Sequence, residues 1–191
     1  MYFFIHILKA GRNGGSLLAE TLPRGEVMRT RMFRLVLLIF LLTLPVSTVH
    51  AEFAVGAAAP GFETTDLEGH AVRLSDYKGH PFILKLATTW CPSCKQQSAE
   101  LAKAGDFLSE NKIPVIEVFV DDTEEDVRQY TQQHPRAEPH VTILDDGSVY
   151  KAYNVYLIPR LLVIDGNFKV KRDGSVIEAS ELKPILQKLL K

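Results

Sequence analysis

Three observations on this chain of 191 residues predict an α/β fold with a central mixed sheet. Two nearly continuous apolar, β-branched runs, at residues 82–88 and 113–120, are typical of strands that are buried on both faces. Each run is followed by a helical pattern, as in strand–helix–strand units. Two later runs, at residues 161–164 and 168–172, flank Asp165-Gly166-Asn167, which favours a closing hairpin and therefore antiparallel strands.

The first half of the predicted domain opens with a hairpin, in which residues 62–66 and 71–74 flank a turn at Gly69. After the first buried run, apolar side chains spaced through residues 94–108 predict one amphipathic helix. After the second run, Thr123 precedes three acidic residues, an arrangement that favours the start of a helix.

The second half carries a short apolar run at residues 141–144, which predicts a third strand of the sheet. Residues 148–153 predict one or two helical turns, and the closing hairpin follows. Residues 180–190 predict a terminal helix that is capped by Ser180 and tolerates Pro184 near its first turn.

The first fifty residues differ from this pattern. Three arginines (29, 31 and 34) precede the apolar run 35–44, and small residues follow as far as Ala51, which is the order of a secretory signal. We therefore divide the chain into three parts. Residues 1–27 are a non-structural stretch or a misassigned start, and residues 28–51 are a signal peptide or N-terminal membrane anchor. Residues 52–191 are the folded domain. Cleavage after Ala51 predicts a periplasmic or secreted protein, and the alternative is anchoring to the inner membrane by residues 33–49.

The charge of residues 52–191 bears on the partners of the domain. With 16 Lys+Arg and 21 Asp+Glu, its formal charge is 16 − 21 = −5. Nucleic-acid binding favours basic patches, so we expect no nucleic-acid partner. We expect the domain to be a monomer.

The two cysteines of the chain lie together in Trp90-Cys91-Pro92-Ser93-Cys94. A disulfide across two residues closes a very short loop, and the chain-entropy account gives it only about 2 kcal/mol of stabilisation. The pair therefore suits a bond that opens and closes better than a structural staple. In an exported protein such a pair is oxidised unless its function keeps it reduced.

The position of the pair suggests that the two cysteines have different roles. Cys91 lies where a strand gives way to a helix, and the unpaired N–H groups and helix dipole there favour a thiolate. Pro92 has no N–H and fits the first helical position. We expect an accessible Cys91 to attack a partner disulfide and a buried Cys94, one turn further on, to release the mixed disulfide.

The run from Phe82 to Cys94 resembles the active-site strand and helix of the thioredoxin superfamily. Upstream, Ala59-Pro60-Gly61-Phe62 and the later Lys78-Gly79 resemble its extracytoplasmic branch of TlpA/ResA/CcmG-like thiol–disulfide oxidoreductases. Downstream, Ile158-Pro159 and residues 161–166 are similar to the cis-proline loop and hairpin of the family. The resemblance covers residues 57–190.

The resemblance implies a thioredoxin-like fold: a central mixed sheet flanked by helices, with an N-terminal β-hairpin and an inserted βα unit. It implies disulfide reduction outside the cytoplasm, with no cofactor beyond the redox-active Cys91–Cys94 disulfide. Exported thiol proteins, apocytochrome c among them, are the implied substrates, and a membrane electron donor is a second implied partner. Around the cysteines, the implied supporting residues are Trp90, Pro92, Ser93, Ile158 and Pro159.

Pro159 is implied to be cis, with the backbone at Ile158 facing the disulfide. Without the resemblance, a trans proline that opens an edge strand is the default, because cis bonds are only about 5–6% of X–Pro bonds.

Two residues depart from the family in charge. Thioredoxins carry a buried Asp six positions before the first cysteine and a Lys partner on the next strand, whereas here these positions hold Lys85 and Glu117. We hypothesise a partly buried pair beneath Cys94, with Glu117 relaying the proton of that thiol. Alternatively, Lys85 extends to solvent and Glu117 is strand surface.

Two further departures surround the motif. Arg160 follows Pro159 where relatives often carry threonine, and its charge either acts on the Cys91 thiolate, selects acidic partners, or points to solvent. Gln97 stands six residues after Cys91, where some reductive relatives place a catalytic glutamate, so that acid is not carried over to this chain.

Other functions stay open at this point. A copper- or metal-binding chaperone would use Cys91 and Cys94 with one histidine from the set His70, His80, His134 and His140, although we predict no metal site. A peroxidase-type relative is suggested by Thr88 and opposed by Leu84, which replaces the proline of that signature. An oxidant, or a permanently oxidised structural pair, is also compatible with the motif.

Overall fold

The structure is a computed structural model that describes residues 32–34, 36, 52–134, 136 and 139–191. Residues 32–34 and 36 are helical and exposed, and they belong to a unit separate from the folded domain. The predicted stretch 1–27 and nearly all of the predicted signal or anchor segment lie outside the described residues. Among the residues described, no helix has the length and apolar character needed to cross a membrane.

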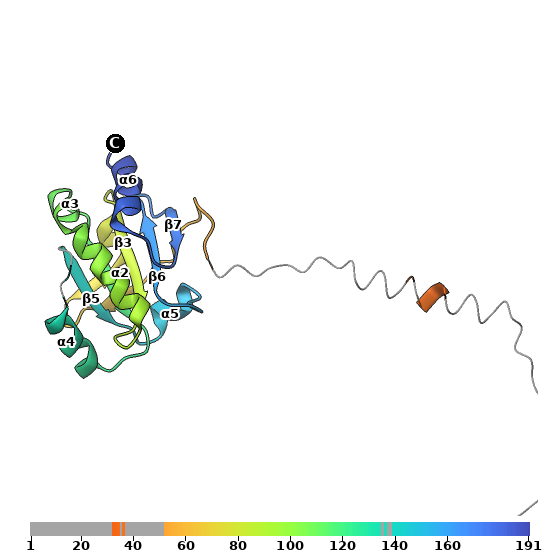
Figure 1. Cartoon of the computed structure of the whole chain (residues 1–191), viewed down its shortest axis with the longest axis horizontal. Coiled ribbons are helices and arrows are strands. Elements are labelled where there is room, and N and C mark those ends of the chain that lie inside the picture. The colour runs from red at the N-terminus through yellow and green to blue at the C-terminus, as the bar shows by residue number, and fades with distance from the viewer. Residues whose placement is uncertain (1–31, 35, 37–51, 135, 137–138) are drawn as a thin grey trace, which may run out of the picture. The chain divides into compact units, whose positions relative to one another are not determined.

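The domain is organised around a five-stranded sheet with the order β5-β4-β3-β6-β7 (Figure 1). Central β3 (Phe82–Ala87) pairs in parallel with β4 (Val115–Phe119) and antiparallel with β6 (Arg160–Ile164). At the edges, β5 (His140–Leu144) is parallel to β4 and β7 (Val170–Gly174) is antiparallel to β6. The predicted mixed sheet and closing hairpin are confirmed.

A second, two-stranded sheet is the predicted N-terminal hairpin, formed by antiparallel β1 (Glu63–Thr65) and β2 (Ala71–Arg73). A 3₁₀ turn, η1 (Leu74–Tyr77), follows it. The helices of the domain are α2 (Pro92–Lys103), α3 (Gly105–Glu110), α4 (Glu124–Gln133), α5 (Ser148–Ala152) and α6 (Ala179–Leu189). Helix α4 starts where predicted, and Thr123 caps it by accepting the backbone N–H of Asp126.

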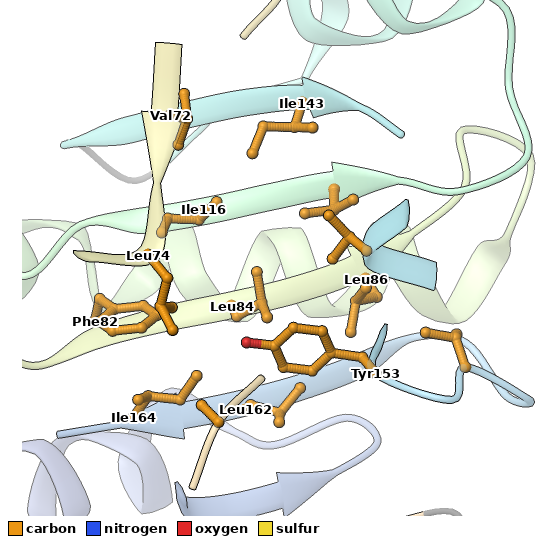
Figure 2. Close-up of a cluster of buried hydrophobic side chains, with 14 of the residues drawn as sticks. Val72, Leu74, Phe82, Leu84, Leu86, Ile116, Ile143, Tyr153, Leu162 and Ile164 are labelled. Atoms are coloured by element: carbon orange, nitrogen blue, oxygen red, sulfur yellow. The ribbon is translucent and has the colours of Figure 1, made fainter. Parts of the chain in front are cut away.

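The alternation of side chains along β3 assigns a different layer to each face of the sheet. Phe82, Leu84 and Leu86 face a core that also takes Val72 of the hairpin and Tyr153, which follows α5 (Figure 2). On the opposite face, Ile83 joins apolar residues of α2, α3 and α6. All six side chains of β3 are buried, as the apolar run predicted, and Lys85 shares the α2 face with Ile83.

The prediction of a single helix through residues 94–108 is wrong. The chain forms α2 and α3 in succession, and the break falls at Ala104 (φ −90°, ψ −1°). Gly105 follows immediately, and glycine is among the residues least favourable to a helix interior. The amphipathic pattern continues across the break, because Leu101 and Leu108 face the same core.

The start of the terminal helix also differs from its prediction. Glu178, not Ser180, occupies the N-cap position of α6, and its side chain makes no capping hydrogen bond. Pro184 consequently lies inside the helix rather than near its first turn. It removes the N–H that would otherwise bond to the Ser180 carbonyl.

Close backbone contact at the β6–β7 turn provides a test of this packing. Gly79 N–H donates to the carbonyl of Gly166 at 2.8 Å, and a Cβ on Gly166 would lie 2.5 Å from the carbonyl carbon of Gly79. We expect Gly166→Ala to lower the free energy of unfolding by about 1–3 kcal/mol, as overpacking does. Urea unfolding checks this, with Gly61→Ala as the matched control, because no atom lies within 4 Å of its added Cβ. Equal loss in the two variants would contradict the prediction.

Candidate active site

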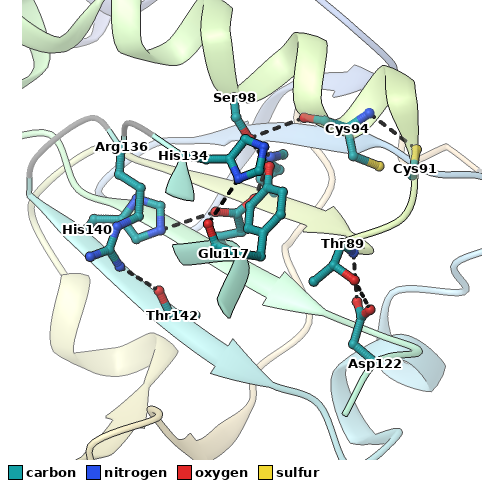
Figure 3. Close-up of polar contacts among 12 residues, drawn as sticks. Thr89, Cys91, Cys94, Ser98, Glu117, Asp122, His134, Arg136, His140 and Thr142 are labelled. Carbon is teal, nitrogen blue, oxygen red and sulfur yellow. Dashed lines mark hydrogen bonds and ion pairs between the residues drawn. The ribbon is translucent and has the colours of Figure 1, made fainter. Parts of the chain in front are cut away.

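The cysteine pair lies at the carboxyl end of central strand β3, at the start of α2. Cys91 is the N-cap of this helix, and its Sγ accepts the backbone N–H of Cys94 at 3.2 Å (Figure 3). Pro92 occupies the first helical position, as expected. The N-terminus of a helix therefore points at the sulfur of Cys91, and a backbone N–H there donates to it.

The two thiols are both free in the structure, and both are largely covered. Cys94 is fully buried, as predicted, whereas Cys91 keeps 7% of its surface exposed and is less accessible than expected. The reason is that Ile158 packs against the cluster formed by Ala87 and the two cysteines. Trp90, Pro92 and Ser93 are exposed beside Cys91, so a partner would approach it over these side chains.

The environment of Cys94 keeps this thiol protonated. Burial raises its pKa, and the hydrogen bond and charge of Cys91 act in the same direction, to a value of about 12. The charge of Lys85 opposes this shift. Cys94 is therefore a neutral thiol at neutral pH and needs help to lose its proton when it attacks Cys91.

The loop opposite the pair has the predicted form. The Ile158–Pro159 bond is cis, and Ile158 contacts the cysteine cluster. Pro159 immediately precedes β6, the antiparallel neighbour of β3. The predicted site residues Cys91, Cys94, Trp90, Ile158 and Pro159 therefore come from two elements that the sheet places side by side.

The hypothesised charge pair is present and fully buried. Lys85 and Glu117 are directly opposite in the parallel register of β3 and β4, and their side chains form an ion pair. Lys85 Nζ also donates to Ser98 Oγ of α2 at 2.5 Å. Ser98 Oγ in turn donates to the carbonyl of Cys94 at 3.2 Å, which connects the pair to the helix of the resolving thiol.

Sequence reasoning missed the outer members of this network. His140 Nε2 of β5 lies 3.2 Å from Glu117 Oε2 (Figure 3). The hydroxyl of Tyr130 in α4 lies 3.0 Å from Ser98 Oγ. Burial alone would raise the pKa of Glu117, but the charge of Lys85 and the contact with His140 outweigh it and lower the pKa to about 2. Glu117 is therefore ionised at neutral pH. Its proton-relay role stays a prediction.

A second missed contact fixes the segment that leads to the motif. Asp122, just after β4, accepts the backbone N–H of Thr89 at 2.9 Å and its hydroxyl at 2.5 Å. Parallel β3 and β4 end at the same edge of the sheet, so an acidic residue just past β4 was the available signal for this contact.

Gln97 does not stand in for a catalytic acid. Its amide is buried and bonds in both directions with the backbone of Ile177, accepting at 2.7 Å and donating at 3.3 Å. It therefore ties α2 to the segment before α6. The carry-over of a glutamate role to this position is not supported.

The histidines considered as metal ligands have other neighbours. His134 stacks on Tyr130 with ring centroids 4.1 Å apart, and His70 Nδ1 lies 3.1 Å from Asp66. Within the described part of the chain, no three His, Cys, Asp or Glu side chains are grouped so that they could hold a metal ion. Thr88 Oγ1 is buried and has no hydrogen-bond partner among the described residues.

A dithiol at the start of a helix, with a buried resolving cysteine and a cis-proline loop against it, defines a site for thiol–disulfide exchange. Residues 55–178 match the AhpC/TSA family, and the chain belongs to this family. The protein is a thiol–disulfide oxidoreductase with Cys91 and Cys94 as its CxxC pair.

Individual relatives agree with this assignment. The chain is 30% identical to the thiol-disulfide oxidoreductase ResA of Geobacillus kaustophilus, over 74% of this chain and 84% of the relative. It is 29% identical to ResA of Bacillus thuringiensis subsp. konkukian, over 75% and 81%. A crystal structure of a thiol:disulfide interchange protein of the thioredoxin family from Chlorobium tepidum superposes with a TM-score of 0.62 at 19% identity, covering 73% of this chain and 99% of that one. The predicted thioredoxin-like fold is confirmed.

The buried pair predicts a specific acid sensitivity. The pKa of Glu117 is about 2 in the folded chain and about 4.3 in an unfolded one, so the unfolded state takes up the proton first as the pH falls. The stabilisation is complete above the unfolded pKa and is lost between about pH 4 and pH 2, by up to about 3 kcal/mol. Urea unfolding at pH 5 and at pH 2.5 measures it.

The control is the double variant Lys85→Met/Glu117→Leu, which replaces the ion pair with apolar side chains of similar size. We expect its unfolding free energy to fall less than that of the wild type between the two pH values. An equal fall would place the acid sensitivity elsewhere in the chain.

The relay hypothesis is tested at the resolving step. In Glu117→Gln, we expect Cys94 to release a mixed disulfide on Cys91 more slowly at neutral pH, because the hypothesised proton acceptor, the Glu117 carboxylate, is gone. Stopped-flow measurement of release across pH 6–10 reads this out. Faster release would mean that the pair acts on Cys94 by charge alone, and an unchanged pH profile would contradict any role in this step.

Proposed function

We propose that this protein reduces disulfides of exported proteins outside the cytoplasm through the Cys91/Cys94 dithiol, with apocytochrome c as a candidate substrate. The observation that carries the proposal is the asymmetry of the pair. Cys91 Sγ lies at the N-terminus of α2 and accepts a backbone N–H there, whereas burial holds Cys94 as a thiol. The ResA relatives, whose name describes thiol–disulfide oxidoreductases, support the same chemistry.

The reaction that we propose has two exchange steps. The Cys91 thiolate attacks one sulfur of the substrate disulfide, whose S–S bond breaks, and a mixed disulfide forms while one substrate thiolate leaves. Cys94 then loses its proton and attacks Cys91 Sγ, which forms the Cys91–Cys94 disulfide and releases the second substrate thiolate. Two electrons pass from the dithiol to the substrate.

Each cycle leaves the protein oxidised, so the proposal needs a source of electrons. We infer a membrane electron donor that reduces the Cys91–Cys94 disulfide by the same exchange in reverse. The basic–apolar–small order of residues 28–51 supports a location outside the cytoplasm, whether the segment is cleaved or serves as an anchor. A monomer is sufficient for this chemistry, since both cysteines belong to one chain.

The reduction potential of the pair tests the direction of electron flow. We expect a value near that of thioredoxin, about −270 mV, when the purified protein is equilibrated against defined thiol buffers. A value near about −120 mV, as in the strong oxidant DsbA, would instead identify a disulfide donor. A pair that does not equilibrate at all would exclude redox function.

A trapping experiment accompanies this measurement. Cys94→Ser retains the attacking thiol and lacks the resolving one, so it should accumulate mixed disulfides with exported proteins when it is expressed in cells. Cys91→Ser is the matched control and should trap far fewer partners. Mass spectrometry of the trapped proteins identifies the substrates, apocytochrome c included.

A further inference from the structure

The loop between α5 and β6 lies against the dithiol. Its last residue before the proline, Ile158, packs on the two cysteines, while Tyr156 and Leu157 are 70% and 80% exposed. The loop therefore presents apolar side chains to solvent immediately beside the residue that meets the cysteine pair. The orientation of residues 153–158 determines what a polypeptide substrate encounters there.

Arg160 is the first anchor of this loop, and its position differs from all three alternatives given for it in the sequence analysis. It neither points to solvent nor faces the cysteines as a free charge: it is buried, and its guanidinium makes two hydrogen bonds to Asp173 of β7, at 2.8 and 2.6 Å. Its Nη1 donates to the carbonyl of Tyr153 and, at 3.3 Å, to that of Asn154. One side chain thus joins the beginning of the loop to the sheet.

Phe53 is the second anchor, and it comes from the segment just after the predicted export region. Its backbone N–H donates to Asp173 Oδ2 at 2.6 Å. Its ring lies under the guanidinium of Arg160, 5.1 Å from ring centroid to Cζ, and meets the ring of Tyr153 edge-on at 5.8 Å. The phenol of Tyr153 then donates to the carbonyl of Pro60 at 2.9 Å, which attaches the same N-terminal segment a second time.

A purely structural role would not require this arrangement. A buried ion pair contributes little net stability compared with apolar side chains of similar volume. Apolar side chains, however, offer no donors to the two loop carbonyls, whereas the planar guanidinium provides several donors in a fixed geometry. Arg160 bonds both to Asp173 and to the loop, so its contacts fix the position of the loop relative to the sheet.

We propose that Phe53, Arg160 and Asp173 form a loop clamp that positions residues 153–158 for polypeptide disulfides. The hydrogen bonds and the ion pair described for the clamp residues go to one another and to the loop, so we expect them to act through the loop. This inference rests on the proposed function in its choice of substrate. A small disulfide needs access to Cys91 alone, whereas a polypeptide also contacts the loop, so the clamp matters for the second class of substrate.

The test compares two substrates of Phe53→Ala, a variant that keeps the backbone hydrogen bond to Asp173. We expect kcat/KM for insulin disulfides to fall about five- to tenfold, mainly through KM, because the cation–π and aromatic contacts are lost. The rate with the small disulfide 5,5′-dithiobis(2-nitrobenzoate) should change less than about twofold, since the dithiol is untouched. Phe53→Leu should restore part of the insulin activity.

The matched control is Phe107→Ala, because Phe107 is a partly buried phenylalanine in the core on the other face of the sheet. It should affect both substrates alike. If Phe53→Ala also lowered the activities with insulin and with the small disulfide by the same factor, the contacts of Phe53 would contribute only to stability. The proposal would then be wrong.

Hydrogen–deuterium exchange provides a second measurement that needs no substrate. Amides of residues 154–158 should exchange faster in Phe53→Ala than in the wild type, with those of α2 unchanged. Unchanged exchange in the loop would overturn the clamp even if insulin activity fell. If the wild-type protein did not reduce insulin, the proposed function would fail, and the exchange result would still decide whether the clamp exists.

Discussion

Burial of β3 on both faces is the constraint on which the rest of the structure depends. The strand lies between a parallel and an antiparallel neighbour, so its end is fixed from both sides, and Cys91 follows that end within four residues of Ala87. The price of this position is that one charged side chain, Lys85, has no route to water. Glu117, Ser98 and His140 supply its surroundings from three other elements, and the sheet and α2 are joined by polar contacts as well as by apolar packing.

Two buried ion pairs lie near the cysteines, and each affects a different part of the active site. Lys85–Glu117 lies below α2, and the charge of Lys85 opposes the rise that burial causes in the pKa of Cys94. Ser98 also connects Lys85 to the carbonyl of Cys94. Arg160–Asp173 lies behind the cis-proline loop, and we propose that it fixes the position of residues 153–158. Cys91 therefore lies between a resolving thiol that burial keeps protonated and the cis-proline loop, whose position we propose to depend on Arg160 and Asp173.

Much of this was visible in the sequence, for reasons that can be stated. Local sequence patterns are enough to predict individual helices and strands. Examples are the buried runs at β3 and β4, the acidic start of α4 and the Asp-Gly turn of the closing hairpin. The Lys85–Glu117 pair followed from the resemblance to thioredoxins, which carry a pair of opposite charges at the same two positions. The break at Ala104 had a local signal in Gly105, which the continuing amphipathic pattern outweighed. The start of α6 and the contacts of Gln97 were not predictable, because they depend on distant groups: Glu100 accepts the N–H of Ala179, and Gln97 bonds to the backbone of Ile177. Arg160 was misjudged because its partner, Asp173, is defined by the pairing of β6 with β7.

The carboxylate of Asp173 limits which side chains position 160 can accept. It serves a guanidinium and a backbone N–H at once, and its side chain is only 1% exposed. Replacing Arg160 alone would leave a buried anion without its counter-ion, and replacing Asp173 alone would leave a buried cation. An uncharged side chain at position 160 is therefore expected to cost less stability when position 173 is also uncharged than when Asp173 is kept. The same carboxylate joins the N-terminal segment to β6, so substitutions at these two positions also bear on how that segment attaches to the sheet.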